Sequence, residues 1–346
     1  MISKRRFFYS AVLIIFAAVL LCGCTEKPKP IRQTELALGT VCTVSLFDSG
    51  DKALLPASFS LISELENSIS KNLRESEISA LNRNAGLSPV KLSEPVFKLL
   101  TIAQKYSILS EGMFDVTIDP VVELWGIGTD HAAVPSRDAL CHAVSLVDYR
   151  ALVLDSDART AFLPRKELAV DLGGIAKGYI ADQVRDFLVS GGASGGIIDL
   201  GGNILVFGRK PDGSDFRIGI QDPFGGRGSS IGVVTMAQGS VVTSGIYERF
   251  FEQDGKRYHH IFDTRTGFPV ENTLAGVTVI TQDSVSGDAL STAVFALGLE
   301  KGMALVEKNS GVDAIFITKD KEVFISSGLK ESFTLTDRNF TMRGMF

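Results

Sequence analysis

The sequence predicts an α+β fold, and three observations lead to this class. Helical and strand patterns follow one another in mixed order, without the strict alternation of a βαβ protein. The chain shows no repeat of fixed period. No linker-like stretch interrupts it after residue 34. We therefore expect a single compact unit over residues 35–346.

The first part of this unit is expected to consist mainly of helices. Apolar residues between Leu54 and Ile69 recur close to the 3.6-residue period. Ser93, followed by Glu94 and Pro95, is a typical helix start, and Ser136 is another. The expected elements are a strand at Leu36–Phe47, helices from Leu54 to Ile69, from Ser93 to about Leu109 and from Ser136 to about Val144, and strands at Ala151–Leu154 and Leu168–Asp171.

The second part is expected to be richer in strands. A helix from about Ile175 to Ser190 ends at two glycines, and the pattern then changes to strands separated by glycine-rich turns. Asp254-Gly255 lies between two β-prone runs, which predicts a hairpin. The remaining expected elements are a helix at Ser286–Leu297, another through Val306, and strands at Val312–Thr318 and Val323–Ile325.

The composition is that of a globular protein with a sizeable core. Of 346 residues, 45% are hydrophobic and 22% are charged. The formal net charge is −5 and no basic block follows residue 6, so we expect no nucleic-acid partner. A small anionic ligand is compatible with this charge if positive groups or a metal meet it locally.

The first residues have the pattern of a bacterial lipoprotein signal. Positive residues 4–6 precede an apolar run at Phe7–Leu21, and the motif LCGC then ends at Cys24. We expect a signal peptide over residues 1–23, an acylated Cys24, and a tether over residues 24–34. A membrane-spanning anchor is the alternative, but the run is short of the ~20 residues that a span needs. Lipid anchoring would place the chain on the periplasmic side of a membrane, the inner membrane in preference to the outer.

Export makes disulfides possible, but the cysteines give no sign of one. Cys42 and Cys141 are the cysteines that follow the signal region, and neither lies in a CxxC or metal-type spacing. We expect two buried thiols.

The tetrapeptide Asp-Leu-Gly-Gly occurs twice, beginning at Asp171 and at Asp199. The first copy leads into a helix, whose N-terminus suits a phosphate because it offers free N–H groups and partial positive charge. Lys177 lies in the first turn of this helix, where a cation is unfavourable unless an anion compensates it. An ordinary strand-to-helix turn is the alternative, since GxGxxG is absent here.

The second copy has a different continuation. Asn203–Phe207 has a strand pattern, so this copy is expected to form a tight turn or lead to another strand. The different continuations argue against a duplicated unit.

Two further patterns carry candidate chemistry. Asp288 and Thr292 are four residues apart on a predicted helix, so their oxygens could bind Mg²⁺. Alternatively, Asp288 serves the helix N-terminus and Thr292 packs or bonds to the preceding turn. His259 and His260 precede Asp263, and one of the two could act as a general base. Because neighbours on a strand point to opposite faces, at most one histidine should face a given site.

Taken together, six stretches closely resemble the ApbE-type family of FAD:protein FMN transferases, over Leu36 to about Ile325. The resemblance implies an α+β fold of the ApbE type, with mixed or antiparallel β-structure, packed helices and one catalytic unit. The stretches, in family order, are SEISALN, GMFDVTIDPVVELWGIG, DLGGIAKGYIAD, DLGGN, TSGIYERFFEQDGKRYHHIFDTRTGFPV and SGDALSTA.

The resemblance also implies an activity. Family members are exported lipoproteins that bind FAD and Mg²⁺ and transfer FMN to a threonine of an acceptor protein, releasing AMP. Acceptors would include subunits of membrane redox pumps. Some members instead hydrolyse FAD to FMN and AMP. A flavin-binding lipoprotein without chemistry is the alternative from another class.

Residue roles follow from the same resemblance. Asp171 and Lys177 would contact FAD. The Gly174 carbonyl and the side chains of Asp288 and Thr292 would hold magnesium. His260 would be the general base or orient the hydroxyl. The remaining residues implied to line the FAD cleft are Met113, Phe114, Asp115 and the turn from His260 to Asp263, including Phe262.

Two positions depart from the family pattern. Leu38 stands where methionine is common, and as an apolar residue it should still pack against FAD. Asn72 replaces an aromatic residue that would stack on FAD, which removes up to ~1.5 kcal/mol of ring contact. In the resembling family, asparagine here goes with FAD pyrophosphatase behaviour.

Overall fold

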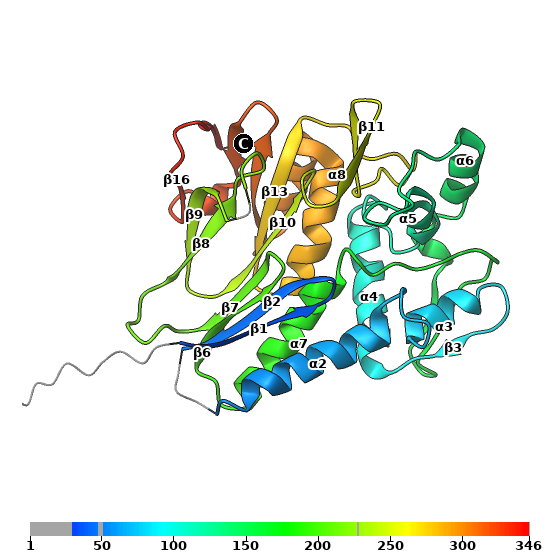
Figure 1. The fold of residues 1–346 in the computed structure, drawn as a ribbon, viewed down its shortest axis with the longest axis horizontal. Helices are drawn as coiled ribbons and strands as arrows, with labels where there is room; N and C mark the ends of the chain where they lie inside the picture. The colour runs from blue at the N-terminus through cyan, green and yellow to red at the C-terminus, as the bar shows by residue number, and fades with distance from the viewer. Residues whose placement is uncertain (1–29, 48–50, 227, 346) are drawn as a thin grey trace, which may run out of the picture.

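A nine-stranded sheet forms the centre of the molecule in the computed structural model, which describes residues 30–47, 51–226 and 228–345 (Figure 1). Neighbouring strands are antiparallel except for β15 and β17, which are parallel. In spatial order the strands are β1 (Ile31–Ala37), β2 (Thr40–Leu46), β6 (Gly195–Leu200), β7 (Asn203–Gly208), β10 (Gly239–Gly245), β13 (Leu274–Thr281), β14 (Asp313–Thr318), β15 (Glu322–Ile325) and β17 (Thr341–Met345).

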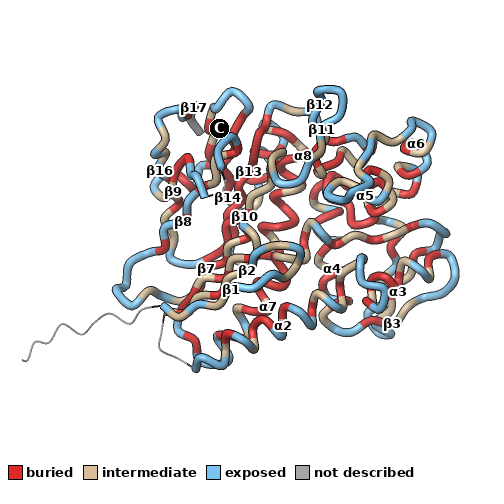
Figure 2. Tube along the Cα trace, viewed as in Figure 1, coloured by how far each residue is buried: buried red, intermediate tan, exposed pale blue. Residues whose placement is uncertain are grey.

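Both faces of this sheet are covered, so its central strands are buried (Figure 2). On one face lie helices α7 (Ala176–Ser190) and α8 (Ser284–Lys308). On the other lies a three-stranded sheet of β16 (Phe333–Leu335), β9 (Ser230–Met236) and β8 (Phe216–Gln221). The alternation of a strand divides its side chains between two cores: Ala314 and Phe316 belong to the helical core, whereas Ile315 and Ile317 pack with β8.

The remaining elements lie beside α7 and α8 (Figure 1). These elements are α2 (Leu54–Ile69), α3 (Glu77–Arg83), α4 (Glu94–Leu109), α5 (Asp119–Trp125), α6 (Arg137–Ser145), the small sheet of β3 (Val90–Lys91), β5 (Thr160–Phe162) and β4 (Val153–Asp155), and the hairpin of β11 (Phe250–Gln253) and β12 (Lys256–His259). The β11–β12 hairpin packs with α5 and α6 in a separate aromatic core around Trp125.

The long predicted helices are confirmed within one or two residues. Helices α2, α4, α6 and α7 have the expected bounds, and the Ser136 hydroxyl accepts a hydrogen bond from Ala139 N–H at the start of α6. The two helices expected between Ser286 and Val306 form the single helix α8, which is kinked at Gly298. Gly298 has φ 78°, a backbone angle that glycine adopts without a Cβ penalty.

The single strand expected at Leu36–Phe47 is wrong, because the chain forms the β1–β2 hairpin there. Leu38 and Gly39 make the turn with φ of 55° and 67°. These angles are those of a type I′ turn, which requires positive φ at both positions, and Gly39 was the only residue of the pair whose type signals such a turn.

The strand expected at Leu168–Asp171 is also wrong. The backbone of Val170 is paired at both polar atoms with the side-chain amide of Asn82, at 2.8 and 3.0 Å. The Asp171 N–H donates to the Val116 carbonyl at 2.8 Å. The polar backbone atoms of Val170 and the Asp171 N–H are hydrogen-bonded, but their partners are a helix side chain and a loop and not a neighbouring strand. The short helices α3 and α5 and the strands β3, β5, β16 and β17 had not been predicted.

The glycine and cysteine expectations have mixed outcomes. The second Asp-Leu-Gly-Gly forms the tight turn between β6 and β7, with φ of 68° at Gly201 and 93° at Gly202.

Cys42 is buried as expected, but Cys141 is exposed and both thiols are free. Cys24, the signal peptide and residues 24–29 of the tether lie outside the described residues.

Helix α8 is long and apolar enough to cross a membrane by length and composition, but 61% of its most apolar window is buried inside the protein. Its contacts with β10, β13 and α7 identify it as the core helix of the fold.

Candidate functional site

Helices α7 and α8 approach each other closely at Gly178. A Cβ built on Gly178 would lie 2.3 Å from the Ser284 carbonyl oxygen, so only glycine allows this packing. The contact brings the first turns of the two helices together. The site is therefore built from two helix N-termini, each of which has backbone N–H groups without partners in its own helix.

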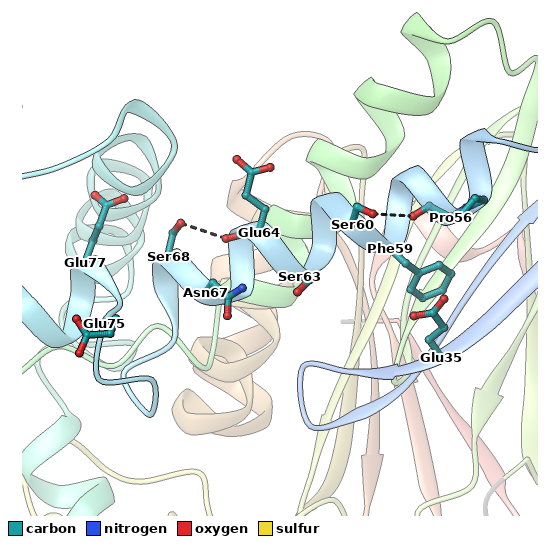
Figure 3. A pocket seen from close by; sticks show the side chains of 10 residues that line it. All are labelled: Glu35, Pro56, Phe59, Ser60, Ser63, Glu64, Asn67, Ser68, Glu75 and Glu77. Atoms are coloured by element: carbon teal, nitrogen blue, oxygen red, sulfur yellow. Dashed lines mark hydrogen bonds between the residues drawn. The ribbon is translucent and has the colours of Figure 1, made fainter.

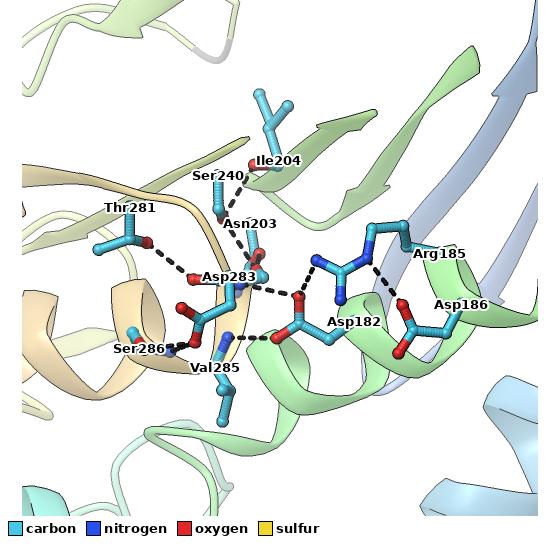
Figure 4. A network of polar contacts seen from close by, with 11 residues as sticks. Asp182, Arg185, Asp186, Asn203, Ile204, Ser240, Thr281, Asp283, Val285 and Ser286 are labelled. Atoms are coloured by element: carbon cyan, nitrogen blue, oxygen red, sulfur yellow. Dashed lines mark hydrogen bonds and ion pairs between the residues drawn. The ribbon is translucent and has the colours of Figure 1, made fainter. Parts of the chain in front are cut away.

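Each helix supplies a carboxylate to the N-terminus of the other, and Figure 4 shows the one from Asp182. Asp182 of α7 accepts hydrogen bonds from Ser284 N–H at 2.9 Å and Val285 N–H at 2.8 Å. Asp288 of α8 accepts one from Gly178 N–H at 2.8 Å. Burial raises the pKa of Asp182 to about 6, although these N–H groups and Arg185 oppose that shift. The expectation that Asp288 serves its own helix N-terminus is wrong, because Asp283 caps α8.

The three residues expected to hold magnesium lie at this junction. Asp288 is 4% exposed, and its second carboxylate oxygen has Lys177 Nζ at 3.9 Å. Thr292 lies one turn along α8. A Cβ on Gly174 would lie 3.5 Å from Thr292 Oγ1, so the Gly174 backbone lies beside this hydroxyl.

The chemistry of this group fits a hard cation. A carboxylate, a hydroxyl and a main-chain carbonyl are oxygen ligands, and Mg²⁺ uses few protein ligands. Across the described part of the chain, no group of three or more His, Cys, Asp or Glu side chains could hold a metal ion.

The first Asp-Leu-Gly-Gly copy forms the entry to α7. The Asp171 carboxylate accepts a hydrogen bond from Gly173 N–H at 2.6 Å, which fixes the turn just before Gly174. Lys177 follows in the first turn of α7. The unfavourable position of this cation is eased by the Asp288 carboxylate at 3.9 Å.

Residues 113–115 pack beside the glycine turn at Gly173 and Gly174. The Phe114 ring lies 3.2 Å from a Cβ built on Gly174, and both Met113 and Phe114 are buried in the main core. Asp115 is buried and its carboxylate accepts from Thr117 N–H, Thr117 Oγ1 and Tyr149 N–H. Burial raises the pKa of Asp115 against these bonds. Its carboxylate therefore stabilises the loop through three bonds within the protein.

The two histidines face different surroundings, as expected. His259 is buried and its Nε2 lies 3.0 Å from the Val270 carbonyl. His260 is half-buried and its Nδ1 lies 3.2 Å from the Arg249 carbonyl. A carbonyl can only accept, so Nδ1 of His260 carries the proton and Nε2 is the basic nitrogen. Burial lowers the pKa of His260 to about 4.

The other predicted contacts lie on the surrounding elements. Phe262 packs on Trp125 in the aromatic core, with ring centroids 6.0 Å apart. Leu38, in the β1–β2 turn, donates its N–H to Glu66 Oε2 at 3.1 Å. Asn72 is exposed on the loop before α3.

With this geometry described, comparison with known proteins gives a family. Residues 38–316 match the model of the ApbE family. The chain belongs to the ApbE family. A curated relative from Klebsiella pneumoniae, named FAD:protein FMN transferase, is 39% identical over 88% of this chain and 94% of its own length. One from Treponema pallidum with the same name is 36% identical over 96% of both chains.

Solved structures of ApbE proteins share the fold. The ApbE protein of Thermotoga maritima superposes with a TM-score of 0.80 at 28% identity, covering 85% of this chain and 96% of that one. The flavin transferase ApbE of Vibrio cholerae gives a TM-score of 0.79 at 29% identity, covering 88% and 99%. These likenesses confirm the predicted α+β fold of the ApbE type.

Sequence reasoning missed an ion cluster beside the ApbE-type glycine turn, in which only Glu123 is exposed. Lys71 contacts the carboxylates of Asp119 and Glu123, and its Nζ lies 3.5 Å from Asp171 Oδ2. Burial lowers the pKa of Lys71, but Asp171 and Asp119 outweigh burial and hold it above its ordinary value. Burial raises the pKa of Asp119 to about 6 despite Lys71. In the sequence, only the four-residue spacing of Asp119 and Glu123 could have indicated this cluster, because it places both carboxylates on one side of a helix.

Two hollows on the surface lie apart from Gly174, Lys177, Asp288 and Thr292. A groove of about 880 Å³ runs along α2 beside β1 (Figure 3). Its lining includes Glu35, Glu64, Glu75 and Glu77, so its charge would repel a pyrophosphate. A second pocket of about 440 Å³ lies near His259 and Lys319. The candidate site of this ApbE-family chain is the α7–α8 junction, because chemistry-bearing residues gather there.

Proposed function

We propose that this chain is an FAD:protein FMN transferase that moves FMN from FAD to a threonine of an acceptor protein and releases AMP. The names of its ApbE-family relatives support the reaction class. The observation that carries the proposal for the site is the meeting of Gly174, Asp288 and Thr292 beside Lys177. This group supplies positive charge and hard oxygen ligands at a helix N-terminus, which a pyrophosphate substrate requires.

The proposed reaction balances as follows. The threonine oxygen forms a bond to the phosphorus on the FMN side of the pyrophosphate. The bond from that phosphorus to the bridging oxygen breaks, and AMP leaves with the bridging oxygen. The proton of the threonine hydroxyl passes to a base. Since phosphoryl transfer asks little covalent chemistry of the protein, positioning and charge neutralisation provide most of the rate.

His260 is the proposed base or hydroxyl-orienting group. Its Nδ1–H is held by the Arg249 carbonyl, which leaves the lone pair of Nε2 for a hydroxyl proton. Burial lowers its pKa to about 4, so the imidazole is neutral at neutral pH and Nε2 can accept a hydrogen bond that orients the threonine hydroxyl. Lys177, half-exposed at the start of α7, is proposed to contact the phosphates.

We propose Mg²⁺ as the ion held by Asp288, Thr292 and the Gly174 carbonyl. Bound there, it would neutralise charge on the phosphate oxygens. The nearly buried Asp288 carboxylate supports this role, because one of its oxygens is engaged by Gly178 N–H while the other has only a distant ammonium. Such a carboxylate is costly to bury without a cation nearby.

Hydrolysis of FAD to FMN and AMP is the second proposed activity. The exposed Asn72 supports it, since an amide offers no ring for stacking and water could compete with the acceptor. The sequence at Cys24 supports a lipid-anchored enzyme on the periplasmic side of the inner membrane. Subunits of membrane redox pumps are the proposed acceptors.

The metal group is tested by changing Asp288 to Asn. The amide can still accept the Gly178 hydrogen bond but loses the charge that a cation needs. We expect AMP release from FAD with Mg²⁺, measured by chromatography, to fall by about 100-fold or more, a loss typical of removing an electrostatic stabiliser. Asp138→Asn, which removes an exposed carboxylate on α6, is the matched control and should keep full turnover.

Retained turnover in Asp288→Asn would contradict the metal assignment. A flavin-binding protein without chemistry would instead bind FAD and leave its pyrophosphate intact in every variant, including the wild type.

A further inference from the structure

We propose that Lys71 is a positioning residue for FAD: its ammonium fixes the Asp171 carboxylate, and through it the glycine turn of the site. This inference rests on the proposed function. Lys71 lies on the loop before α3, between Ser70 at the end of α2 and the exposed Asn72. Its side chain points into the protein and is 12% exposed.

The contacts of Lys71 connect three separate segments. Its ammonium pairs with Asp119 and Glu123, which lie one turn apart on α5. It also lies 3.5 Å from Asp171 Oδ2. Its carbonyl accepts a hydrogen bond from Ser79 Oγ of α3 at 2.7 Å. One residue therefore joins the loop of Asn72, helix α5 and the entry to α7.

From Asp171 the connection continues to the site. The other oxygen of Asp171 accepts Gly173 N–H at 2.6 Å. The next residue, Gly174, lies beside Thr292 and Phe114. The orientation of the Asp171 carboxylate therefore determines the geometry of the backbone that we propose to hold the metal.

Asn82 performs the complementary task on the same segment. Its amide pairs with both polar backbone atoms of Val170, so the main chain before Asp171 is fixed from α3. The backbone is thus already held, and what Lys71 adds is control of the Asp171 side chain. This separation allows a test that distinguishes positioning from folding.

Charge makes Lys71 more than a surface ion pair. Asp119 and Asp171 have side chains 9% and 15% exposed, and Lys71 is the cation that contacts both. Without it, two poorly solvated carboxylates face each other, and Asp171 presents uncompensated negative charge at a site for an anionic substrate.

The first experiment measures FAD binding to the purified protein by quenching of flavin fluorescence, together with the melting temperature and AMP release. We expect Lys71→Met to raise the Kd for FAD about tenfold or more, the effect of one lost charge-assisted contact. Lys71→Arg keeps the cation and should recover most of the affinity. Lys98→Met, which removes an exposed ammonium on α4, is the matched control and should bind FAD as the wild type does.

A double variant separates positioning from stability. Lys71→Met with Asp119→Asn removes one cation and one anion, so the net charge of the cluster stays as in the wild type. If Lys71 positions Asp171, the double variant regains melting temperature but keeps the weakened FAD binding. If Lys71 acts only on folding, by relieving the repulsion between the buried Asp119 and Asp171, the double variant regains both, and the inference is overturned.

The outcomes also distinguish this inference from the proposed function. Wild-type protein that binds FAD and releases AMP, with Lys71→Met equal to it in both measurements, overturns the role of Lys71 alone. Wild-type protein that neither binds FAD nor releases AMP overturns both.

Discussion

The role that a single residue can have at this site depends on which of its polar atoms are already hydrogen-bonded within the protein. Asp115 has its carboxylate engaged by three protein donors, whereas Asp288 has one oxygen engaged and one facing Lys177. Both aspartates are nearly buried. The sequence could identify them as candidates, but their partners come from segments far away in the chain. That difference, visible only in the structure, separates a loop-stabilising aspartate from a ligand candidate.

His259 gives a pH prediction at the same scale. Its Nε2 donates to the Val270 carbonyl and its Nδ1 lies 3.3 Å from Ile261 N–H, so the folded protein holds the neutral ring. Burial lowers its pKa from 6.5 to about 4. Between these values the unfolded chain binds a proton that the folded chain does not, so stability falls as the pH drops from 6.5 to 4.

The effect of His259 should be about 3 kcal/mol in total. We expect the stability advantage of the wild type over His259→Gln, measured by urea unfolding, to shrink by that amount between pH 6.5 and pH 4. Other titrating groups are common to both proteins and cancel in the difference. An advantage that is independent of pH would contradict the neutral, buried assignment.

At the scale of elements, the α7–α8 pair is the unit that makes the site. Each helix caps the other through Asp182 and Asp288, and their close approach depends on Gly178. Helix periodicity predicted α7 within one residue and placed helix along α8, although as two helices where the structure has a single kinked one. It could not predict that they pack N-terminus to N-terminus, because that depends on tertiary contacts about a hundred residues apart.

Gly178→Ala tests this packing. Alanine favours a helix interior by up to about 1 kcal/mol over glycine. The new Cβ, however, would lie 2.3 Å from the Ser284 carbonyl oxygen and 2.8 Å from Asp288 Cβ, and backbone cannot yield as a flexible side chain can. We expect the clash to win and to lower the free energy of unfolding by about 2 kcal/mol, within the range for overpacked cores.

The matched control is Gly226→Ala, where a new Cβ would have no heavy atom within 4 Å. It should change the unfolding free energy by less than about 0.5 kcal/mol. Equal stability of Gly178→Ala and the wild type would show that the two helices can separate without cost.

At the scale of the whole molecule, the fold class and most long elements were predictable, while short elements and connections were not. Helices of 15 or 16 residues, such as α2 and α7, carry several turns of apolar periodicity. The hairpin turn at Leu38 and the extended segment at Leu168 depend on backbone angles and distant partners that local patterns do not encode. The ion cluster around Lys71 was missed for the same reason, since its members come from residues 71, 119, 123 and 171.

The candidate site combined both kinds of information. Asp288 and Thr292 were selected by their spacing on a predicted helix and Gly174 by the resemblance to the ApbE family, and the structure places all three at one helix junction. Lys177 Nζ lies 3.9 Å from the Asp288 carboxylate, so a positive charge lies beside the proposed metal ligands. This arrangement supports the proposed cleavage of the FAD pyrophosphate. It does not determine whether a threonine hydroxyl or water attacks the phosphorus.

The most direct test of the central claim is mass spectrometry of an acceptor incubated with this enzyme, FAD and Mg²⁺. The acceptor is a subunit of a membrane redox pump, the class of acceptor proposed above, and the variant with its acceptor threonine changed to valine is the control. We predict a covalent FMN adduct on the threonine and one AMP released for each adduct. AMP without an adduct would assign the chain to FAD hydrolysis, and the absence of both products would contradict the account.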